Sequence, residues 1–348
     1  IDEFEGIKDL KDGIIRCVGD AGQRFDEDAL RMLRAVRFAG QLGFEIDDNT
    51  RNAIVQRADR LENISAERIR VELTKLLVAK EAGRLRDAYS TGMTRYFLPE
   101  LDKAMVTEQK NPHHIYTVGE HSIHGIEIMN CFFEVTSDRK MYDKVPEKIM
   151  STAKKIAKKM NKKQHTILCM AMLLHDIAKP VVMTVDDDGT GHFYGHPQES
   201  EKMAKKIMRR LTFDNESISK VCRLVKFHDY RIEDSNRAFR RAVSKIGADI
   251  MDMLFLVEYA DVLSQSDKML EEKLSKINSG VERFEYITQN AQPLSIKELA
   301  LTGSDLIAAG VKPGPNMGEI LKKMLDKVLD EPEANTKENL LEYLKTMD

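Results

Sequence analysis

The strongest constraint on the fold is an apolar stretch that carries two metal-capable side chains, Leu173-Leu174-His175-Asp176-Ile177-Ala178-Lys179. Burying a histidine and an aspartate in such surroundings is costly unless other groups satisfy them. A lone buried histidine is usually hydrogen-bonded to its neighbours in the core. Here four further candidates accompany the pair, at His121, His196, His228 and Asp261, and the six positions span about 140 residues. They can meet only if several helices converge.

Length and composition favour a multi-domain protein. At 348 residues the chain exceeds what one core usually organises, so two or three domains are expected. A hydrophobic content of 42%, a charged content of 32% and the absence of Trp fit a charged, largely helical surface. The longest apolar run, 167–174, is too short to span a bilayer, and no secretory signal is visible, so no membrane is expected as a partner.

Apolar periodicity is mostly helical, and the predicted fold class is mainly α. Residues 26–42 form an expected amphipathic helix with Asp26 as its N-cap and Gly43 at its end. Two further helices are expected to begin at Asp47 or Asp48 and at Ser65. Strand signals are few: one strand over 14–18 and a short hairpin over 181–185 and 192–194.

The last segment is expected to be helical with clear interruptions. Ser295 is a candidate helix cap, while Gly310 and the run 313–315 break the chain before another helix. Residues 330–337 are expected to form a loop before a final short helix. The sequence carries no signal of oligomeric state.

The cysteine and charge patterns exclude only some classes of function. The four cysteines lie far apart with no C-x-x-C pair, which favours reduced thiols in a cytoplasmic protein over a zinc ribbon or disulfide framework. The net charge of -3 does not indicate nucleic-acid binding. Two basic stripes at helical spacing, over 154–163 and 202–210, can either follow a phosphate backbone or form solvated helix faces.

The run Glu27-Asp28-Ala29-Leu30-Arg31 can read a nucleobase. On a helix, Asp28 and Arg31 share a face and present an acceptor beside a forked donor. Cytosine and adenine both offer an amino donor beside a ring-nitrogen acceptor, so such a pair can accept C and A and reject G and U. The alternative is an ordinary surface ion pair, because Asp-x-x-Arg is common on helices.

Four stretches resemble class II bacterial tRNA nucleotidyltransferases and poly(A) polymerases. They are the neck-like residues 12–39 with the E-D-x-x-R run, residues 64–73, and the segments 299–306 and 312–315 near the carboxyl end. The resemblance implies that Asp28 and Arg31 pair with the incoming CTP or ATP and that Glu27 helps to hold them. Arg34 then either reaches the nucleotide or balances the acidic start of the helix.

The same resemblance implies a supporting and a missing part. Segment 67–72 is similar to the family's helix-bracing motif, in which Arg68 and Glu72 can form an i,i+4 pair. Nucleotidyl transfer needs Mg²⁺ held by a Gly-Ser and Asp-x-Asp motif of a head domain, and no such motif stands upstream of Glu27. We therefore expect residues 1–10 to be the last strand of that head, and the chain to be a fragment or to lack the head.

The order His121, His175-Asp176, His196, His228, Asp261 resembles the HD phosphohydrolase superfamily, and residues 111–122 resemble its entry in tRNA nucleotidyltransferases. By that likeness the metal ligands are His121, His175, Asp176 and Asp261, while His196 and His228 bind a second metal or a substrate phosphate. Imidazole and carboxylate ligands without thiolate suit Mn²⁺, Fe²⁺, Co²⁺ or Ni²⁺, with Mg²⁺ less favoured. No metal role is assigned to the remaining histidines, His113, His114, His124, His165 and His192.

Such a centre would hydrolyse a phosphoester with metal-activated water. Lys179, one turn after His175, is the candidate cation for the phosphoryl oxygens; the alternative is a solvated lysine that ends a helical turn before Pro180. Ala178 stands where the superfamily often has Gly, a small departure.

The expected domains are 1–22 as a head remnant, 23–105 as a nucleotide-selecting and RNA-binding neck and body, 106–265 as the HD domain, and 266–348 as a tRNA-binding tail. Two functions remain open. One is a tRNA 3′-end nucleotidyltransferase without its catalytic head, with the tRNA acceptor end and CTP or ATP as partners. The other is a stand-alone HD phosphohydrolase with an RNA-binding scaffold; a non-catalytic RNA-binding module is a third reading.

Overall fold

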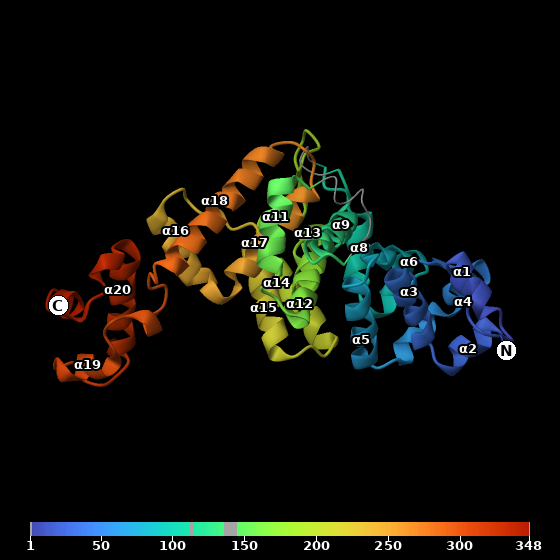
Figure 1. Ribbon diagram of the computed structural model, residues 1–348, viewed down its shortest axis with the longest axis horizontal. Coiled ribbons are helices and arrows are strands. Elements are labelled where there is room, and N and C mark those ends of the chain that lie inside the picture. Colours follow the sequence, from blue (N-terminus) through green and yellow to red (C-terminus); the bar gives the residue numbers. More distant parts are fainter. Residues whose placement is uncertain (1, 111–114, 136–144, 348) are drawn as a thin grey trace. The chain divides into compact units, whose positions relative to one another are not determined.

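The computed structural model describes residues 2–110, 115–135 and 145–347, and the chain divides into two compact units. Unit 1 comprises residues 1–229 and 253–274, and unit 2 comprises residues 230–252 and 275–348. Helices dominate both units (Figure 1), so the prediction of a mainly α protein is confirmed. Each unit is described by itself below.

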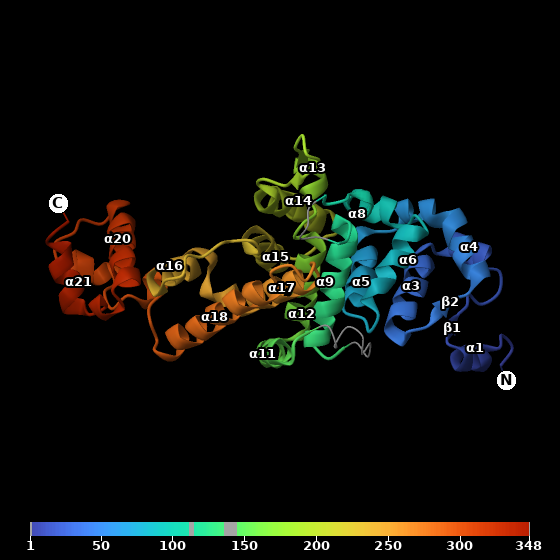
Figure 2. The ribbon, with the colours of Figure 1, turned by 90° about the horizontal axis from the view of Figure 1, so that it is seen from above.

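The first part of unit 1 is a set of short helices with one pair of two-residue strands. The elements are α1 (Gly6–Asp12), β1 (Ile14–Ile15), α2 (Ala21–Glu27), α3 (Leu30–Leu42), β2 (Glu45–Ile46), α4 (Asp48–Arg57), η1 (Ala58–Asn63), α5 (Ala66–Leu77), η2 (Ala82–Arg84), α6 (Leu85–Ser90), α7 (Thr94–Phe97) and α8 (Pro99–Val106). Strands β1 and β2 pair in parallel, with Ile14 opposite Glu45 (Figure 2).

The amino end differs from the prediction. The expected strand over 1–10 is wrong, because α1 occupies Gly6–Asp12, and the expected strand over 14–18 is reduced to Ile14–Ile15. The Asp2 carboxylate accepts hydrogen bonds from the backbone N–H groups of Gly6 and Ile7 at 2.8 and 2.9 Å. Capping of this kind satisfies donors that a helix start leaves unpaired, and so favours a helix here.

The expected single helix over 26–42 is wrong at its start. Helix α2 ends at Glu27 and α3 begins at Leu30, so Asp26 is an interior residue of α2; the N-cap of α2 is Asp20, whose side chain accepts from Gln23 N–H. Gly43 ends α3 as predicted, with a positive φ of 72° that glycine adopts without strain. Asp47 and Ser65 are the N-cap residues of α4 and α5, as predicted.

Helices α3 and α5 pack through their apolar faces. Leu33 and Val36 of α3 and Leu73 and Leu76 of α5 are fully buried. Burying one such side chain contributes roughly 1.5–3 kcal/mol, so this contact fixes α5 against the segment that carries Glu27 to Arg37. Phe38 of α3 is 36% exposed and lies outside this contact.

The second part of unit 1 holds the histidines. Its elements are α9 (Val118–Phe132), α11 (Glu147–Ala157), α12 (Lys162–Leu174), α13 (Lys179–Val182), β3 (Thr184–Val185), β4 (Gly191–His192), α14 (His196–Arg210), α15 (Asn215–Phe227) and most of α17 (Met251–Leu263). The predicted hairpin is confirmed in a shorter form, with Thr184 opposite His192 in an antiparallel pair. Val181 and Val182 belong to α13 rather than to the strand.

Helix α12 is the central helix of this part. Every residue from Ile167 to Leu174 is buried, which leaves no polar face along that run. The stretch Lys162–Val182 has the length and composition of a membrane-crossing segment, but 78% of the tested window lies inside the protein. A core helix has the same composition as a membrane segment because both are apolar on every side.

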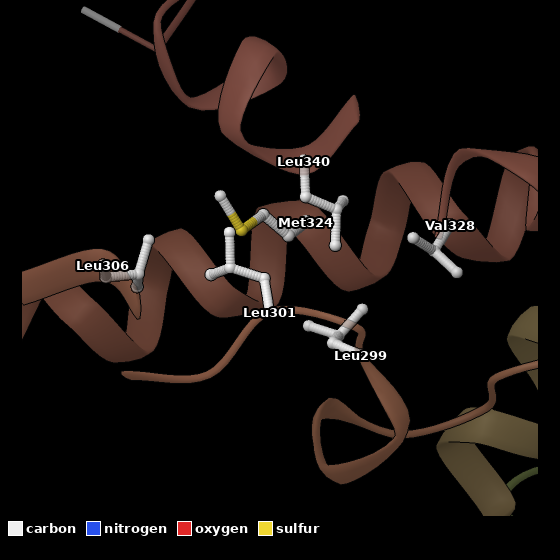
Figure 3. Packing of buried hydrophobic residues seen from close by; sticks show 6 residues of the cluster. All are labelled: Leu299, Leu301, Leu306, Met324, Val328 and Leu340. Atoms are coloured by element: carbon white, nitrogen blue, oxygen red, sulfur yellow. The ribbon is translucent and has the colours of Figure 1, made fainter. Parts of the chain in front are cut away.

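Unit 2 has a small core of its own. Its elements are α16 (Asn236–Ile246), η3 (Ala248–Ile250), the larger part of α18 (Leu270–Gln289), η4 (Ile296–Glu298), α19 (Gly303–Ala308), α20 (Asn316–Asp330), η5 (Pro332–Ala334) and α21 (Lys337–Leu344). Figure 3 shows the cluster in which Leu301, Leu306, Met324 and Leu340 pack together. The interruption before α20 is as predicted, and Ser295 precedes the short η4 rather than a full helix.

Candidate functional site

Asp28 lies at the break between α2 and α3 and is held from two sides. Its backbone is extended, with φ of -152° and ψ of 99°. Its Oδ1 accepts a hydrogen bond from Leu30 N–H at 3.2 Å, and its Oδ2 accepts one from Arg68 Nη2 at 2.7 Å. Partial burial acts to raise the pKa of Asp28, but these hydrogen bonds outweigh it and hold the pKa below 3.8. The carboxylate is therefore charged and fixed by a residue of another helix.

Arg31 is oriented by a different set of partners. Its Nη1 donates to Glu27 Oε2 at 2.6 Å and to the backbone oxygen of Arg24 at 2.8 Å. The hydrogen bond from Arg31 also lowers the pKa of Glu27. Asp28 and Arg31 therefore lie next to each other in the chain, but each is paired with a third residue rather than with the other.

A buried ion pair braces α3 against α5. Arg37 Nε lies 2.7 Å from Glu72 Oε2, and both side chains are less than a tenth exposed. Arg34, half-exposed, lies 3.6 Å from the other oxygen of Glu72. The expected Arg68–Glu72 pair is therefore wrong: Glu72 faces α3, while Arg68 reaches Asp28.

The guanidinium of Arg37 also covers the exposed ring of Phe38 at 3.8 Å, and that of Arg34 lies 5.5 Å from the same ring. Cation–π contacts of this kind hold both arginines along one side of α3.

Six side chains from five places in the sequence converge in the second part of unit 1. His121 Nε2 lies 2.8 Å from Asp261 Oδ1, 3.2 Å from His175 Nε2 and 3.6 Å from Asp176 Oδ2. On the other side of Asp176, its Oδ1 lies 3.3 Å from His196 Nε2 and 3.6 Å from His228 Nε2. Asp176 is thus shared between two histidine pairs.

The outer nitrogen of each histidine faces a backbone carbonyl. His175 Nδ1 lies 2.8 Å from Met172 O, His196 Nδ1 2.9 Å from Phe193 O, and His228 Nδ1 2.8 Å from Val225 O. His121 Nδ1 lies 3.2 Å from Ser264 O. Because a carbonyl can only accept, each Nδ1 carries the hydrogen and each Nε2 presents a lone pair to the centre in the neutral ring.

This arrangement fits divalent metal. The Nε2 atoms face each other at 3.2 Å in one pair and at 3.4 Å in the other, which is unfavourable for lone pairs unless a proton or a cation lies between them. Asp176 Oδ1 is buried and makes no hydrogen bond to any of the described residues, so it can bind a cation. Two groups have metal-ligand spacing: His121 with His175 and Asp176, and Asp176 with His196 and His228.

The pKa shifts of His175 and Asp176 also favour a bound cation. Burial acts to lower the pKa of His175, but Asp176 and Asp261 outweigh it and raise the pKa to about 10. Burial acts to raise the pKa of Asp176, but His175 and Lys179 hold it well below 3.8. The negative field that favours a proton on His175 also favours a divalent cation in its place.

Lys179 is buried beside the centre. Its Nζ lies 2.6 Å from Asp176 Oδ2 and donates to Gln109 Oε1 at 2.8 Å. A buried lysine of this kind balances the charge of the carboxylate that it contacts. Gln109 was not a candidate from the sequence, because no motif singles out a glutamine 70 positions from its partner.

Comparison with known proteins gives two family-model matches, the second of which includes part of the histidine cluster. A family model described as the probable RNA and SrmB-binding site of polymerase A matches residues 43–105, and one described as the putative domain 2 of tRNA nucleotidyltransferase matches residues 196–344. The CCA-adding enzyme of Leuconostoc mesenteroides is 46% identical over 99 residues, which are 28% of this chain and 25% of that protein. The chain is therefore similar to class II tRNA nucleotidyltransferases.

Solved structures of this family share the fold. The Bacillus stearothermophilus CCA-adding enzyme in complex with CTP matches 99% of this chain and 68% of its own, with a TM-score of 0.62 and 21% identity. The Thermotoga maritima enzyme complexed with tRNA matches 100% of this chain and 68% of its own, with a TM-score of 0.53 and 20% identity. The matched part spans about a quarter of the length of the curated family members.

Three other histidines lie apart from the ligand groups. His124 Nδ1 pairs with Glu127, His192 Nε2 with Asp186, and His165 Nε2 lies 2.7 Å from Asn130 Oδ1. His113 and His114 lie outside the described residues.

The basic stripes are partly neutralised within unit 1. Lys163 lies 2.7 Å from Glu216, Lys154 lies 2.8 Å from Glu134, and Arg210 makes two hydrogen bonds to Glu100. These pairs fit solvated helix faces, and contact with RNA stays a prediction for the remaining positions.

Proposed function

We propose that this chain is the nucleotide-selecting and tRNA-binding part of a CCA-adding tRNA nucleotidyltransferase that uses CTP and ATP. The observation that carries the proposal is the junction of α2 and α3, where Asp28 and Arg31 are each fixed by a charged partner. A fixed acceptor next to a fixed donor matches the shared edge of cytosine and adenine. Family members solved with CTP and with tRNA support the same partners.

Each segment of the chain would have a separate role. Residues 23–105 would form the neck and body, 266–348 the tail that holds the tRNA acceptor end, and 1–22 the connection to a catalytic head with Mg²⁺ bound to its carboxylates. Shape and backbone contacts suffice for holding tRNA, since A-form RNA is read mostly by shape. A cytoplasmic location is part of the proposal, because the four cysteines are free thiols, as in a reducing compartment.

Substitution of the two proposed base readers tests this function in the full-length protein. Asp28→Ala and Arg31→Ala are expected to impair incorporation of CTP and ATP into tRNA that lacks its 3′ end, while tRNA binding persists. Removing one charge-assisted hydrogen bond costs about 1.5–3 kcal/mol, which is a loss of about 10- to 100-fold in nucleotide use. Arg60→Ala, an exposed residue of η1, is the matched control. Unchanged nucleotide choice and rate in both variants would refute base reading by this pair.

We further propose that residues 106–265 form an HD-type domain that binds divalent metal and hydrolyses phosphoesters at RNA ends. Support comes from four imidazole Nε2 atoms that converge on Asp176 and Asp261. Mn²⁺, Ni²⁺, Co²⁺ or Fe²⁺ fits this ligand set better than Mg²⁺. His121, His175, Asp176 and Asp261 would hold one ion, and His196 and His228 would share Asp176 with a second.

Bound metal would supply Lewis acidity at the phosphoryl group and activate water. The residues of the chain would orient the metal ligands and balance their charge. Backbone carbonyls keep the Nε2 atoms turned inward, and Lys179 offsets the charge of Asp176 at 2.6 Å. A contact between Lys179 and a phosphate, as expected from the sequence, would require the ammonium to move away from Asp176.

Metal content distinguishes this second function from an inert cluster. Purified protein incubated with Mn²⁺ or Ni²⁺ and freed of loose metal is expected to hold near-stoichiometric metal by inductively coupled plasma mass spectrometry. Asp176→Asn should lose most of it, while His192→Ala, whose ring pairs with Asp186 in the hairpin, should keep it. Wild-type protein without metal after this treatment would refute the site.

Metal binding without transfer activity in the full-length protein would favour the alternative, a stand-alone phosphohydrolase on an RNA-binding scaffold. The alternative keeps the same metal ligands and removes the role of Asp28 and Arg31 in choosing a nucleotide. Incorporation of CTP or ATP that depends on Asp28 would reject it.

A further inference from the structure

The two carboxylates of the histidine cluster differ in their access to solvent. The side chain of Asp176 is 2% exposed, whereas that of Asp261 is 14% exposed. The four imidazoles lie between 0% and 13% exposed, with His196 the most accessible of them. Asp261 is therefore the more exposed of the two carboxylates.

A chain of two hydrogen bonds leads from Asp261 to an ammonium group. Gln265 Nε2 donates to Asp261 Oδ1 at 3.0 Å, and Lys273 Nζ donates to Gln265 Oε1 at 2.7 Å. Gln265 follows Asp261 by one helical turn, and Lys273 lies near the start of α18, within unit 1. One amide thus orients both the proposed metal ligand and the lysine.

Lys273 differs from Lys179 in what its charge already contacts. The ammonium of Lys179 is buried and lies 2.6 Å from Asp176, so its charge is used within the centre. Lys273 is half-buried, and the acceptor of its hydrogen bond, Gln265 Oε1, belongs to a neutral amide. An ammonium has three donors, and Gln265 occupies one of them.

Lys273 lies within electrostatic range of the centre. Burial lowers the pKa of Lys273, and the Asp261 and Asp229 carboxylates only partly offset this effect.

We propose that Lys273 binds the phosphate group of the substrate at the histidine cluster and that Gln265 positions it relative to Asp261. The inference rests on the proposed metal-dependent centre and names the residue that would bring a phosphate ester to it. A phosphate oxygen can accept from the ammonium while another faces the metal, since an anionic phosphate offers several acceptors. Lys273 would then contact substrate, and Gln265 would act through Lys273 and Asp261.

Binding of inorganic phosphate to the Mn²⁺-loaded full chain is the direct test. In isothermal titration calorimetry, Lys273→Met is expected to weaken phosphate binding about 10- to 100-fold, as for loss of a charge-assisted hydrogen bond. Lys273→Arg should retain most of the affinity, and Lys268→Met, an exposed lysine of the same segment, should match wild type. Metal content should be equal in all four proteins.

Hydrolysis of p-nitrophenyl phosphate and bis(p-nitrophenyl) phosphate gives a second readout. Lys273→Met should raise KM more than it lowers kcat, and Gln265→Leu should shift both in the same direction by a smaller factor. If the protein binds phosphate through Lys273 but cleaves neither ester, this inference holds and the proposed hydrolysis is wrong.

Three results would overturn the inference: no phosphate binding by the Mn²⁺-loaded wild type, equal binding by Lys273→Met and wild type, or loss of metal from Lys273→Met. Loss of metal would mean that Lys273 positions Asp261 and does not bind the substrate.

Discussion

Glu72→Gln is expected to destabilise unit 1 strongly, because it removes the charge that balances a buried arginine. Arg37 Nε lies 2.7 Å from Glu72 Oε2, and the two side chains are 8% and 4% exposed. Removing one partner of a buried pair leaves the other charge uncompensated, at a cost of about 3–5 kcal/mol. At roughly 2–4 °C per kcal/mol for a domain of this size, the midpoint of thermal unfolding should fall by about 6–20 °C.

Urea unfolding followed by circular dichroism measures the effect, with two controls. Glu67→Gln changes an exposed residue of the same helix and should stay within about 0.5 kcal/mol of wild type. The double variant Glu72→Leu with Arg37→Met removes both charges and should recover most of the loss, since apolar replacements of buried pairs are often neutral. A Glu72→Gln protein as stable as wild type, or a double variant less stable than the single one, would refute the brace.

Three further outcomes follow from buried groups and close contacts. Burial lowers the pKa of His165 to about 4, so between pH 6.5 and pH 4 the unfolded chain binds a proton that the folded chain does not. The free energy of unfolding of wild type, measured by urea titration, should therefore fall by up to about 3 kcal/mol over that range. His165→Gln should flatten this pH dependence, and parallel curves for the two proteins would contradict it. A Cβ on Gly119 would lie 2.7 Å from the backbone nitrogen of Met105, so Gly119→Ala should cost about 1–3 kcal/mol in thermal unfolding, unlike Gly318→Ala, which meets open space. Mn²⁺ at a hundred times its Kd should stabilise wild type by about 2.7 kcal/mol in thermal melts, and Asp176→Asn should show no such shift.

The fold was predictable where one local signal decides the structure. Gly43 ends α3 and Asp47 caps α4 because each satisfies a backbone requirement that needs no distant partner. The break between α2 and α3 was not predictable from periodicity. Asp28 and Ala29 are both compatible with a helix, and the break depends on Asp28 Oδ1 accepting from Leu30 N–H, a local alternative that competes with helix hydrogen bonding.

The histidine cluster was predictable in membership but not in arrangement. The order of residues along the chain indicated which side chains meet, since His175 and Asp176 directly follow α12, in which every residue from Ile167 to Leu174 is buried. That Asp176 stands between two histidine pairs depends on where α9, α14, α15 and α17 place their ends. Gln109, Gln265 and Lys273 carried no motif, although Gln265 lies one turn after Asp261, and that spacing is a usable signal for a supporting residue.

The difference between the expected and the observed junction changes how Asp28 and Arg31 would read a base. On one continuous helix, the two side chains would have been free to pair with each other, and a nucleotide would have had to break that pair. In the structure Arg68 holds Asp28 and Glu27 holds Arg31, so neither must first be released from the other. Holding both groups in place before binding lowers the ordering cost that a nucleotide must offset. If the proposed base reading is correct, Arg68→Met should therefore reduce discrimination between CTP and UTP while Asp28 and Arg31 are unchanged.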